Sequence, residues 1–428
     1  MYTIPNNASK NVLKSAFWRF SLLFIFFYIV PNDIGYLVGY ENYDPTTWNR
    51  PIMWIGENLY GWEFNLDRLF QGFDSRFEVS RYTFVTLAGL IGTCIWLLID
   101  RYFKKKYTNT VKIAVQTILR YHLGIVLIDY GLSKIFMLQF GTIGIDTLEK
   151  TIGEVSGMGL MWNFLSFSEV VVMFSGWMEF IGGFLLFFRK TTFLGAMILL
   201  GIMANVVIMD IGYGITLTMF AILLFCFILL LISTQLKSLF TYFVLNKTTK
   251  PNAYNPLVKS KKIRIVFKVF LLSLIGYFYA KDYSERIVNE TENRYAWFTN
   301  LQTVETFVIN GDTLSTAAKE KNSKAWRKIS FNGLSYYTES FEITKEDNKK
   351  ERFKFEIDST THKIRFRPYH DETKDWNEFS YQKIAKRKYT FEGIYEGDTI
   401  YIAAKTKLLN DYMLMYYKKK QLLDTYYE

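Results

Sequence analysis

The segment formed by residues 112–136 is long and apolar enough to cross a bilayer, yet it carries four side chains that could take part in chemistry. They are Arg120, His122, Asp129 and Lys134. Exposing such groups to lipid is costly, so ionisable residues inside a span almost always face the interior of a helical bundle. We therefore expect these four side chains to bind a ligand there or to find polar partners on neighbouring helices.

Later apolar stretches contain polar side chains that could complete such a site. They are Glu169, Glu179, Asn205 and Asp210. With a rise of about 1.5 Å per residue, Arg120 lies roughly 12 Å and Glu179 roughly 13 Å from the same end of their spans, which predicts an Arg120–Glu179 ion pair. The same counting places a second polar layer roughly 20–33 Å along the spans. It contains Asp129, Lys134, Glu169, Asn205 and Asp210.

Two interpretations of these residues stay open. In the first, the eight side chains line a polar cavity for a small redox or acidic ligand, with Arg120 and Lys134 facing the anion. In the second, Arg120 and Glu179 form an ion pair that only fixes the register of the helices. Lys134 and Asp210 lie near span ends and could instead extend to the interface. His122 could transfer protons or simply form a hydrogen bond within the bundle.

The elements that must position these residues are membrane spans. Half of the 428 residues are hydrophobic and 18% are aromatic, but the apolar runs stop near residue 280. This division predicts a transmembrane domain at 1–280 and a separate β-rich domain at 281–428. The predicted spans cover residues 17–37, 82–99, 112–136, 166–188, 192–209, 215–234 and 263–279.

The charge distribution predicts the orientation of these spans. The net charge is +11, but residues 281–428 hold 26 basic and 24 acidic side chains, so the excess lies in the membrane domain. Segments 1–16, 100–111, 189–191 and 236–262 each carry at least two Lys or Arg, whereas loops 138–165 and 210–214 carry only Lys150. Because short cytoplasmic loops are enriched in Lys and Arg, we expect an inner-membrane protein with a cytoplasmic N-terminus and a periplasmic C-terminal domain. This pattern indicates the lipid bilayer as a partner, and not nucleic acid.

The C-terminal domain shows the alternation of β-strands. Strand-like segments are residues 306–309, 326–331, 336–343, 352–357, 363–367, 389–395 and 399–403. Glu396, Gly397 and Asp398 predict a hairpin between the last two. Several short strands in about 120 residues are typical of a small all-β sandwich or open barrel.

The sequence contains no recognisable set of metal or cofactor ligands. Its two cysteines, Cys94 and Cys226, lie in separate apolar runs, where we expect buried core thiols. Three scattered histidines are too few for the usual metal or haem sites. No haem, flavin or iron–sulfur motif is evident, so a redox role would need a cofactor supplied by a partner.

The order and spacing of several motifs resemble the DoxX-like membrane proteins, which have a four-helix core. In this sequence the motifs are Arg120-x-x-x-Gly124, Asp129-Tyr-Gly131-x-x-Lys134, Phe174-x-Gly176-x-x-Glu179-x-x-Gly182 with Arg189, and Asn205-Val-Val with Tyr213. The resemblance covers a core at 112–235. The layout is similar to a bacterial subgroup with extra N-terminal spans and a C-terminal β-rich domain, to which Gly72-Phe-Asp74, Trp326-Arg-Lys328 and Tyr389-x-Phe-Glu-Gly393 also correspond. The ending Tyr416-Tyr-Lys-Lys-Lys420 departs from the Arg-Gly-Phe-His-Trp-like segment of that subgroup.

The resemblance implies limited functional expectations, because function belongs to sites and not to folds. Some related proteins are subunits of a thiosulfate:quinone oxidoreductase, so one hypothesis is a quinone-interacting subunit of a membrane redox system. The alternative is a non-catalytic scaffold whose periplasmic β-domain binds a partner protein. Solute transport is a third option, without support from a duplicated half or a broken pair of helices. The sequence does not assign a reaction.

Overall fold

The computed structural model describes residues 7–38, 46–64, 74–103, 107–141, 143–250, 254–293, 300–315, 324–332, 340–371 and 373–415. The chain divides into two compact units. The first comprises residues 1–135 and 173–279, and the second comprises residues 136–172 and 280–428. The loop between two core helices therefore groups with the C-terminal part of the chain.

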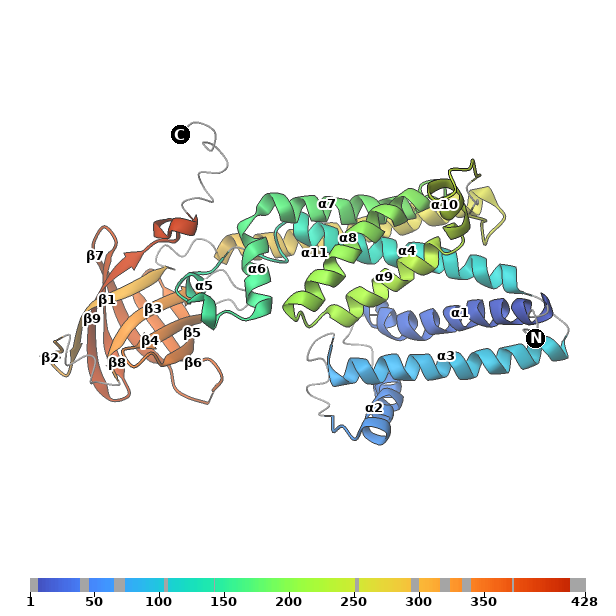
Figure 1. Cartoon of the computed structure of the whole chain (residues 1–428). Coiled ribbons are helices and arrows are strands. Elements are labelled where there is room, and N and C mark those ends of the chain that lie inside the picture. The colour runs from blue at the N-terminus through green and yellow to red at the C-terminus, as the bar shows by residue number, and fades with distance from the viewer. Residues whose placement is uncertain are drawn as a thin grey trace, which may run out of the picture. The chain divides into compact units, whose positions relative to one another are not determined.

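The first unit is a bundle of helices (Figure 1). The helices that begin in it are α1 (Asn7–Val38), α2 (Thr46–Tyr60), α3 (Arg76–Tyr102), α4 (Thr108–Ile135), α8 (Thr192–Tyr213), α9 (Thr218–Ile232), α10 (Leu236–Phe243) and α11 (Lys261–Asn293). Most of α7 (Glu169–Leu186) belongs to it as well. Gly214 ends α8 in the left-handed conformation, with φ of 66°, which a residue without a Cβ adopts readily.

The multi-pass prediction is confirmed. Six helices of the described chain are long and apolar enough to span a membrane, within α1, α3, α4, α7, α8 and α11. A seventh span results if α9 and α10 are counted as one broken span. A bend of 77° at a short break separates these two helices. At the end of α9, Thr234 accepts a hydrogen bond from Gln116 of α4 at 3.0 Å. This contact shows that α9 returns the chain to the end of the bundle where α4 begins.

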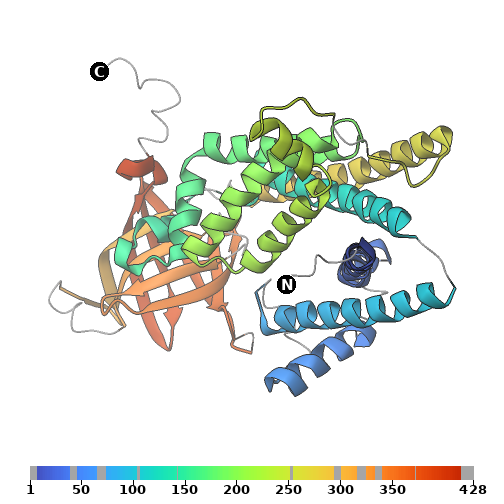
Figure 2. The same cartoon turned by 45° about the vertical axis from the view of Figure 1, so that its right-hand side comes forward.

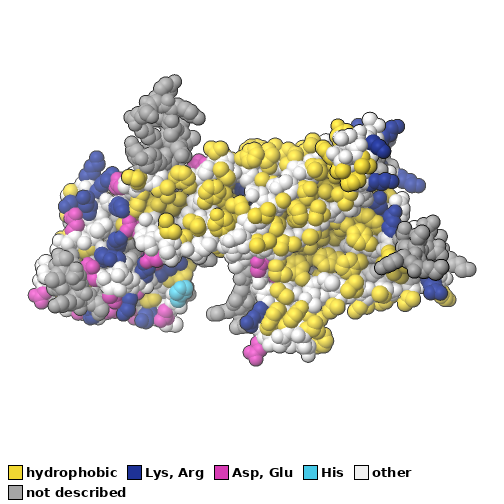
Figure 3. Space-filling model, viewed as in Figure 1, with side chains coloured by type: hydrophobic (Ala, Val, Ile, Leu, Met, Phe, Trp, Pro, Cys, Tyr) yellow, Lys and Arg dark blue, Asp and Glu magenta, His cyan; other side chains and the backbone are white. Residues whose placement is uncertain are grey.

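On the face shown in Figure 3, hydrophobic side chains dominate the helical unit, whereas Lys, Arg, Asp and Glu are spread over the barrel. Such a surface suits a helix surrounded by lipid, since a helix that is hydrophobic all round needs an apolar environment. The prediction of buried core thiols is wrong, because Cys94 and Cys226 are both exposed. They lie on α3 and α9, where the apolar sequence continues on the outer face of the helix.

The second unit contains a closed β-barrel (Figures 1 and 2). Its strands are β1 (Leu301–Ile309), β3 (Trp326–Asn332), β4 (Ser340–Lys345), β5 (Lys350–Asp358), β6 (Lys363–Pro368), β7 (Asn377–Ala385), β8 (Lys388–Tyr395) and β9 (Asp398–Lys407), with a two-residue extra strand β2 (Asp312–Thr313). Every neighbouring pair is antiparallel, and β1 pairs with β9 to close the barrel. The all-β prediction is therefore confirmed as a barrel. The barrel is closed and not open, because β1 pairs with β9, and the sandwich alternative is wrong.

Aromatic side chains fill the barrel interior. The ring of Trp326 stacks on Phe379 with centroids 5.8 Å apart and meets Tyr395 edge-on at 5.4 Å. At Gly393 a Cβ atom would come within 2.3 Å of the Phe379 ring, so this position requires glycine. The inward side chains from all sides of the barrel thus form one packed core.

Sequence patterning located most strands but missed β7. In β7 only Phe379 and Tyr381 point to the core, and polar residues surround them, which weakens the alternation. The predicted hairpin between β8 and β9 is confirmed. Its residues Glu396 and Gly397 have φ of 51° and 86°, as two-residue hairpin turns often require. The start of the predicted strand 336–343 lies outside the described residues, as does the Tyr416–Lys420 ending.

Residues 136–172 carry α5 (Ile145–Leu148), a 3₁₀ turn (Ile152–Glu154) and α6 (Gly157–Phe167). Within this unit Glu149 accepts hydrogen bonds from Lys328 of β3, from Lys407 of β9 at 2.9 Å and from the Tyr412 hydroxyl at 2.6 Å. One carboxylate therefore joins the loop after α4 to two strands and to the segment after the barrel.

Candidate functional site

The candidate site is built on a close approach of α4 and α7. At Gly131 a Cβ atom would lie 2.7 Å from the carbonyl oxygen of Gly176, and at Gly124 it would lie 3.1 Å from that of Gly183. Small residues let the backbones of two membrane helices come together in this way. Each helix carries its two glycines seven residues apart, about two turns, so both contacts lie along one seam.

Lys134 and Glu179 form an ion pair across this seam. The Nζ atom of Lys134 lies 2.6 Å from both carboxylate oxygens of Glu179. The Glu179 side chain is 1% exposed and that of Lys134 is 8% exposed. The Lys134 Nζ also lies 5.7 Å from the centre of the Tyr130 ring, one turn earlier on α4. The lysine side chain therefore extends back along its own helix to meet the glutamate.

The predicted Arg120–Glu179 pair is wrong. Arg120 is buried, and its Nε donates to the backbone oxygen of Leu186 at 2.9 Å, at the last turn of α7. The prediction failed because the count assumed that the two spans begin level with each other, whereas α4 begins at Thr108, about three turns before the level at which α7 ends. The glycine contacts set a register in which Arg120 is level with the end of α7 and Glu179 lies about two turns away.

Asp210 lies near the Lys134–Glu179 pair. It is 5% exposed, its Oδ2 has no hydrogen-bond partner among the described residues, and both Lys134 and Asp74 lie within electrostatic range. Asp74 in turn accepts hydrogen bonds from the backbone N–H groups of Thr218 and Met219, at 3.0 and 2.9 Å. The structure thus places three carboxylates and one lysine in one part of the bundle. In the described chain no group of three His, Cys, Asp or Glu side chains is arranged to hold a metal ion.

The other predicted site residues are divided between the bundle and its surface. His122 is partly buried on α4 beside Phe227, with ring centroids 6.1 Å apart, and its Nε2 is buried without a hydrogen-bond partner among the described residues. Asp129 and Glu169 are partly buried. Asn205 is exposed on α8, so its side chain lies on the outer face of the bundle. The grouping of all eight residues around one ligand stays a prediction.

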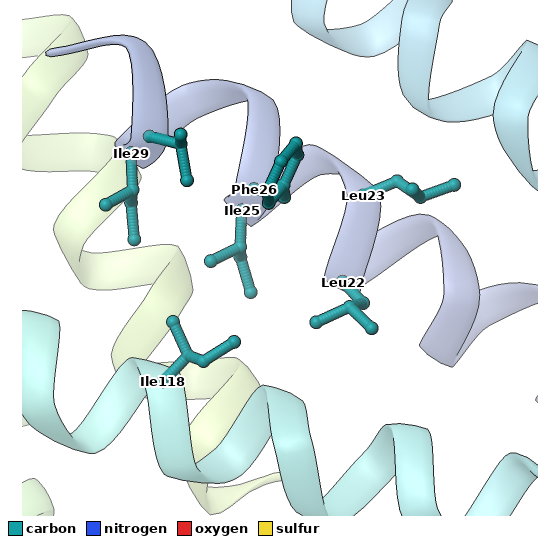
Figure 4. Close-up of a pocket in the computed structure, with 7 residues that line it drawn as sticks. Leu22, Leu23, Ile25, Phe26, Ile29 and Ile118 are labelled. Carbon is teal, nitrogen blue, oxygen red and sulfur yellow. The ribbon is translucent and has the colours of Figure 1, made fainter. Parts of the chain in front are cut away.

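A cleft of about 320 Å³ lies between α1 and α4 (Figure 4). All its lining side chains are hydrocarbon: Leu22, Leu23, Ile25, Phe26, Ile29, Val30 and Ile118. Phe26 is 48% exposed and Ile118 is 37% exposed, so the cleft opens on the outer face of the helical unit. None of the eight predicted site residues lines it, but His122 follows Ile118 by one turn on α4.

Sequence reasoning missed several polar residues of α1 and α3 that face the bundle. Arg19 of α1 pairs with Asp100 of α3, and Arg81 of α3 pairs with Glu78 at 2.8 Å. Arg81 also lies 4.4 Å from the centre of the Tyr28 ring. Arg19 carries the available signal, a charged residue inside an apolar run, whereas Glu78, Arg81 and Asp100 lie outside the predicted span 82–99 and gave no such signal.

Comparison with known proteins agrees with the predicted DoxX-like core. Residues 115–210 match the model of the DoxX family, so the chain contains a DoxX domain made of α4, α7 and α8 and the segment between them. The chain is 33% identical over 86 residues to the uncharacterized protein YwoB of Bacillus subtilis strain 168. That similarity covers 20% of this chain and 54% of YwoB, so the chain spans about half the length of this curated relative. No solved structure matches the chain.

Proposed function

We propose that the helical unit binds an isoprenoid quinone from the bilayer, as a subunit of a membrane redox system. The observation that carries this proposal is the buried Nε2 of His122, which lacks a hydrogen-bond partner among the described residues and lies one turn from the apolar α1–α4 cleft. A buried polar atom without a partner is costly. A quinone carbonyl oxygen would accept a hydrogen bond from this nitrogen.

The cleft suits the isoprenoid tail of such a ligand. Its volume of about 320 Å³ falls within the usual range of ligand sites, roughly 300–1,000 Å³, and its hydrocarbon lining suits an isoprenoid tail. Side chains on a helix lean toward its N-terminus, so the ring of His122 leans toward Ile118. Because the cleft opens on the outer face, the ligand would enter directly from the lipid. The reacting cofactor that exchanges electrons with the quinone belongs to a partner protein.

The test is the quinone content of protein purified in mild detergent, measured by mass spectrometry. Ile118→Trp fills the cleft with an indole and should lower quinone retention about tenfold or more, whereas Ile91→Trp adds the same group to the exposed face of α3 and should not. His122→Leu removes the donor and should also lower retention, while His122→Gln should restore part of it. Equal quinone content in all four variants, or only bulk lipid in the wild type, would refute the proposal.

The second candidate function is a scaffold role for the barrel. It is favoured by a surface on which arginine side chains stack on aromatic rings. Arg365 and Arg367 lie 5.9 and 4.8 Å from the centre of the Trp376 ring, and Arg352 lies 4.7 Å from that of Tyr369. These outward side chains form an aromatic surface on β5 and β6. Glu356 pairs with Arg365 at 2.6 Å, but Arg352 and Arg367 leave an excess of positive charge that would complement an acidic protein partner. The barrel interior is filled by its own side chains, so the outer wall is the available surface.

A photo-crosslinking residue at Trp376 tests this second candidate. An adduct with a protein of acidic surface, lost when Arg365→Glu and Arg367→Glu reverse the charge, would support it. A crosslinker at Ile394, which is 62% exposed on β8, provides the control. An adduct that forms equally at both positions and survives the charge reversal would contradict a specific basic docking surface.

For membrane placement, we propose an inner-membrane protein with its N-terminus in the cytoplasm and its barrel in the periplasm. Support comes from the Lys and Arg enrichment of alternate loops. Single cysteines at Lys190 and Ser359, introduced after replacement of Cys94 and Cys226, can be labelled in intact cells with a membrane-impermeant maleimide. Labelling at residue 359 and protection at residue 190 are expected, and the reverse result would invert the topology.

A further inference from the structure

Four cationic side chains lie close together where α7 ends, about three turns after the start of α4. Arg189 lies within electrostatic range of Arg120, and Lys268 of α11 lies within range of Arg120, Arg189 and Arg264. Lys and Arg side chains collect at this end of the helical unit, around α10 (Figure 3). Four positive charges in one place repel one another unless an opposite charge is present.

Acidic side chains do not supply that opposite charge within the described part of the chain. The ion pairs found there between helices of the first unit join Arg19 to Asp100 and Lys134 to Glu179. The charged neighbours of Lys268 are all arginines. Those of Arg120 are Arg189, Lys268 and two tyrosines. The cluster therefore has a local excess of positive charge.

Arg120 makes this cluster different from a solvated basic loop. Its side chain is only 4% exposed, and the hydrogen bond that the described residues offer it uses Nε alone. A guanidinium has five N–H donors in a planar fork, which leaves most of its hydrogen-bonding capacity for another group. Burying a cation stabilises a protein only when opposite charge and further hydrogen bonds compensate its desolvation.

The side chains around Arg120 are held in position. The Nη1 of Arg189 donates to the backbone oxygen of Tyr254 at 3.2 Å, and Tyr254 is itself buried. The Nζ of Lys268 lies 4.7 Å from the centre of the Phe188 ring. These contacts bring the α7–α8 turn, the loop before α11 and α11 itself together around one point. Such preorganisation lowers the cost of binding a ligand.

We propose that Arg120, Arg189, Arg264 and Lys268 form a binding site for a phosphate group. Arginine forks match phosphate oxygens in bidentate geometry, and lysine adds a compact charge. The same chemistry is presented by the headgroup of an anionic phospholipid and by free inorganic phosphate. The competing explanation is that the cations only stabilise the carboxyl end of α7. That explanation requires no bound anion.

The experiment counts phosphatidylglycerol molecules retained by the full chain in native mass spectrometry, after reconstitution in phosphatidylcholine nanodiscs doped with phosphatidylglycerol. The variant Arg189→Gln/Lys268→Gln leaves the buried Arg120 in place, so the bundle should still fold. The matched control Lys190→Gln/Lys262→Gln removes two exposed charges from the same two segments, outside the cluster. A second arm titrates inorganic phosphate against each protein in pure phosphatidylcholine nanodiscs and records Tm.

We expect the wild type and the control to retain phosphatidylglycerol, and the cluster variant to lose it by at least about tenfold. If retention is equal but phosphate raises Tm in the wild type and the control only, the site holds and its ligand is the free anion. If the cluster variant and the control behave alike in both arms, the proposal is overturned and the cations only stabilise the helix end.

Discussion

Lys134 of α4 donates to both carboxylate oxygens of Glu179 of α7, at 2.6 Å each, inside the bundle. The two residues are 45 positions apart in the sequence, and their pairing depends on the glycine contacts that bring α4 and α7 together. This ion pair is the best-defined polar contact of the DoxX domain. It also has a direct energetic consequence, because both charges are removed from solvent.

Lys134→Met should destabilise the protein by about 3–5 kcal/mol, since it leaves the carboxylate of Glu179 buried without its cation. The double variant Lys134→Met/Glu179→Leu should recover much of that loss, because the unpaired charge is gone. Denaturant unfolding in detergent micelles measures both changes. As a control, breaking the exposed Arg286–Asp282 pair should cost no more than about 0.5 kcal/mol. Equal losses in the single and double variants would contradict the pairing.

Gly131→Ala should separate α4 from α7. The added Cβ would lie 2.7 Å from both the oxygen of Gly176 and the nitrogen of Phe180, and these backbone atoms can move only if the helices move. Overpacking of this kind costs about 1–3 kcal/mol. The control is Gly201→Ala on α8, where no atom lies within 4 Å of the new Cβ. A fall in Tm at position 131 and none at position 201 is expected, and equal effects would contradict the close approach.

The sequence was sufficient to predict the spans, and charges inside apolar runs singled out Lys134 and Glu179, which the structure pairs. It could not predict which charges pair. Counting residues from span ends matched Arg120 with Glu179, whereas the actual register depends on where α4 begins and on the glycine contacts. The reach of the Lys134 side chain back along α4 was a further unknown.

In the barrel too, the pattern within a strand was predictable and the pairing between distant strands was not. The alternation in β9, where Ile400, Ile402 and Ala404 point inward, is visible in the sequence. The pairing of β1 with β9, which closes the sheet, joins segments about 100 residues apart and leaves no local pattern. The α1–α4 cleft is likewise invisible in the sequence, because it arises from the packing of two apolar helices.

Asp74→Ala should destabilise the start of α9. The Asp74 carboxylate accepts from the N–H groups of Thr218 and Met219, which the first turn of α9 cannot satisfy internally. Loss of such a cap costs about 0.5–2 kcal/mol, and Asp74→Asn should retain part of the stability because the amide oxygen still accepts. Thermal unfolding of the wild type and both variants tests the expected order of Tm, in which the wild type is highest and Asp74→Ala is lowest. If the alanine and asparagine variants unfold together, the capping role is wrong.

Glu149 should make the stability of the second unit depend on pH. Burial alone would raise the pKa of this carboxyl, but hydrogen bonds from Lys328, Tyr412 and Lys407 outweigh it and lower the pKa to about 2 from the ordinary value of 4.5. Because the folded-state pKa is the lower one, the stabilisation is fully present above about pH 4.5. It is lost as the pH falls from about 4.5 toward 2, where the folded state also becomes protonated.

The measurement is Tm between pH 6 and pH 3 for the wild type and for Glu149→Gln, which removes the titrating group. The difference in Tm between the two proteins should shrink as the pH falls. Protonation of Glu149 removes from the wild type the same stabilisation that the substitution removes. Glu392→Gln, at an exposed position on β8 of the same unit, serves as the control and should follow the wild type. A constant difference between wild type and Glu149→Gln would contradict a contribution of the ionised carboxylate to stability.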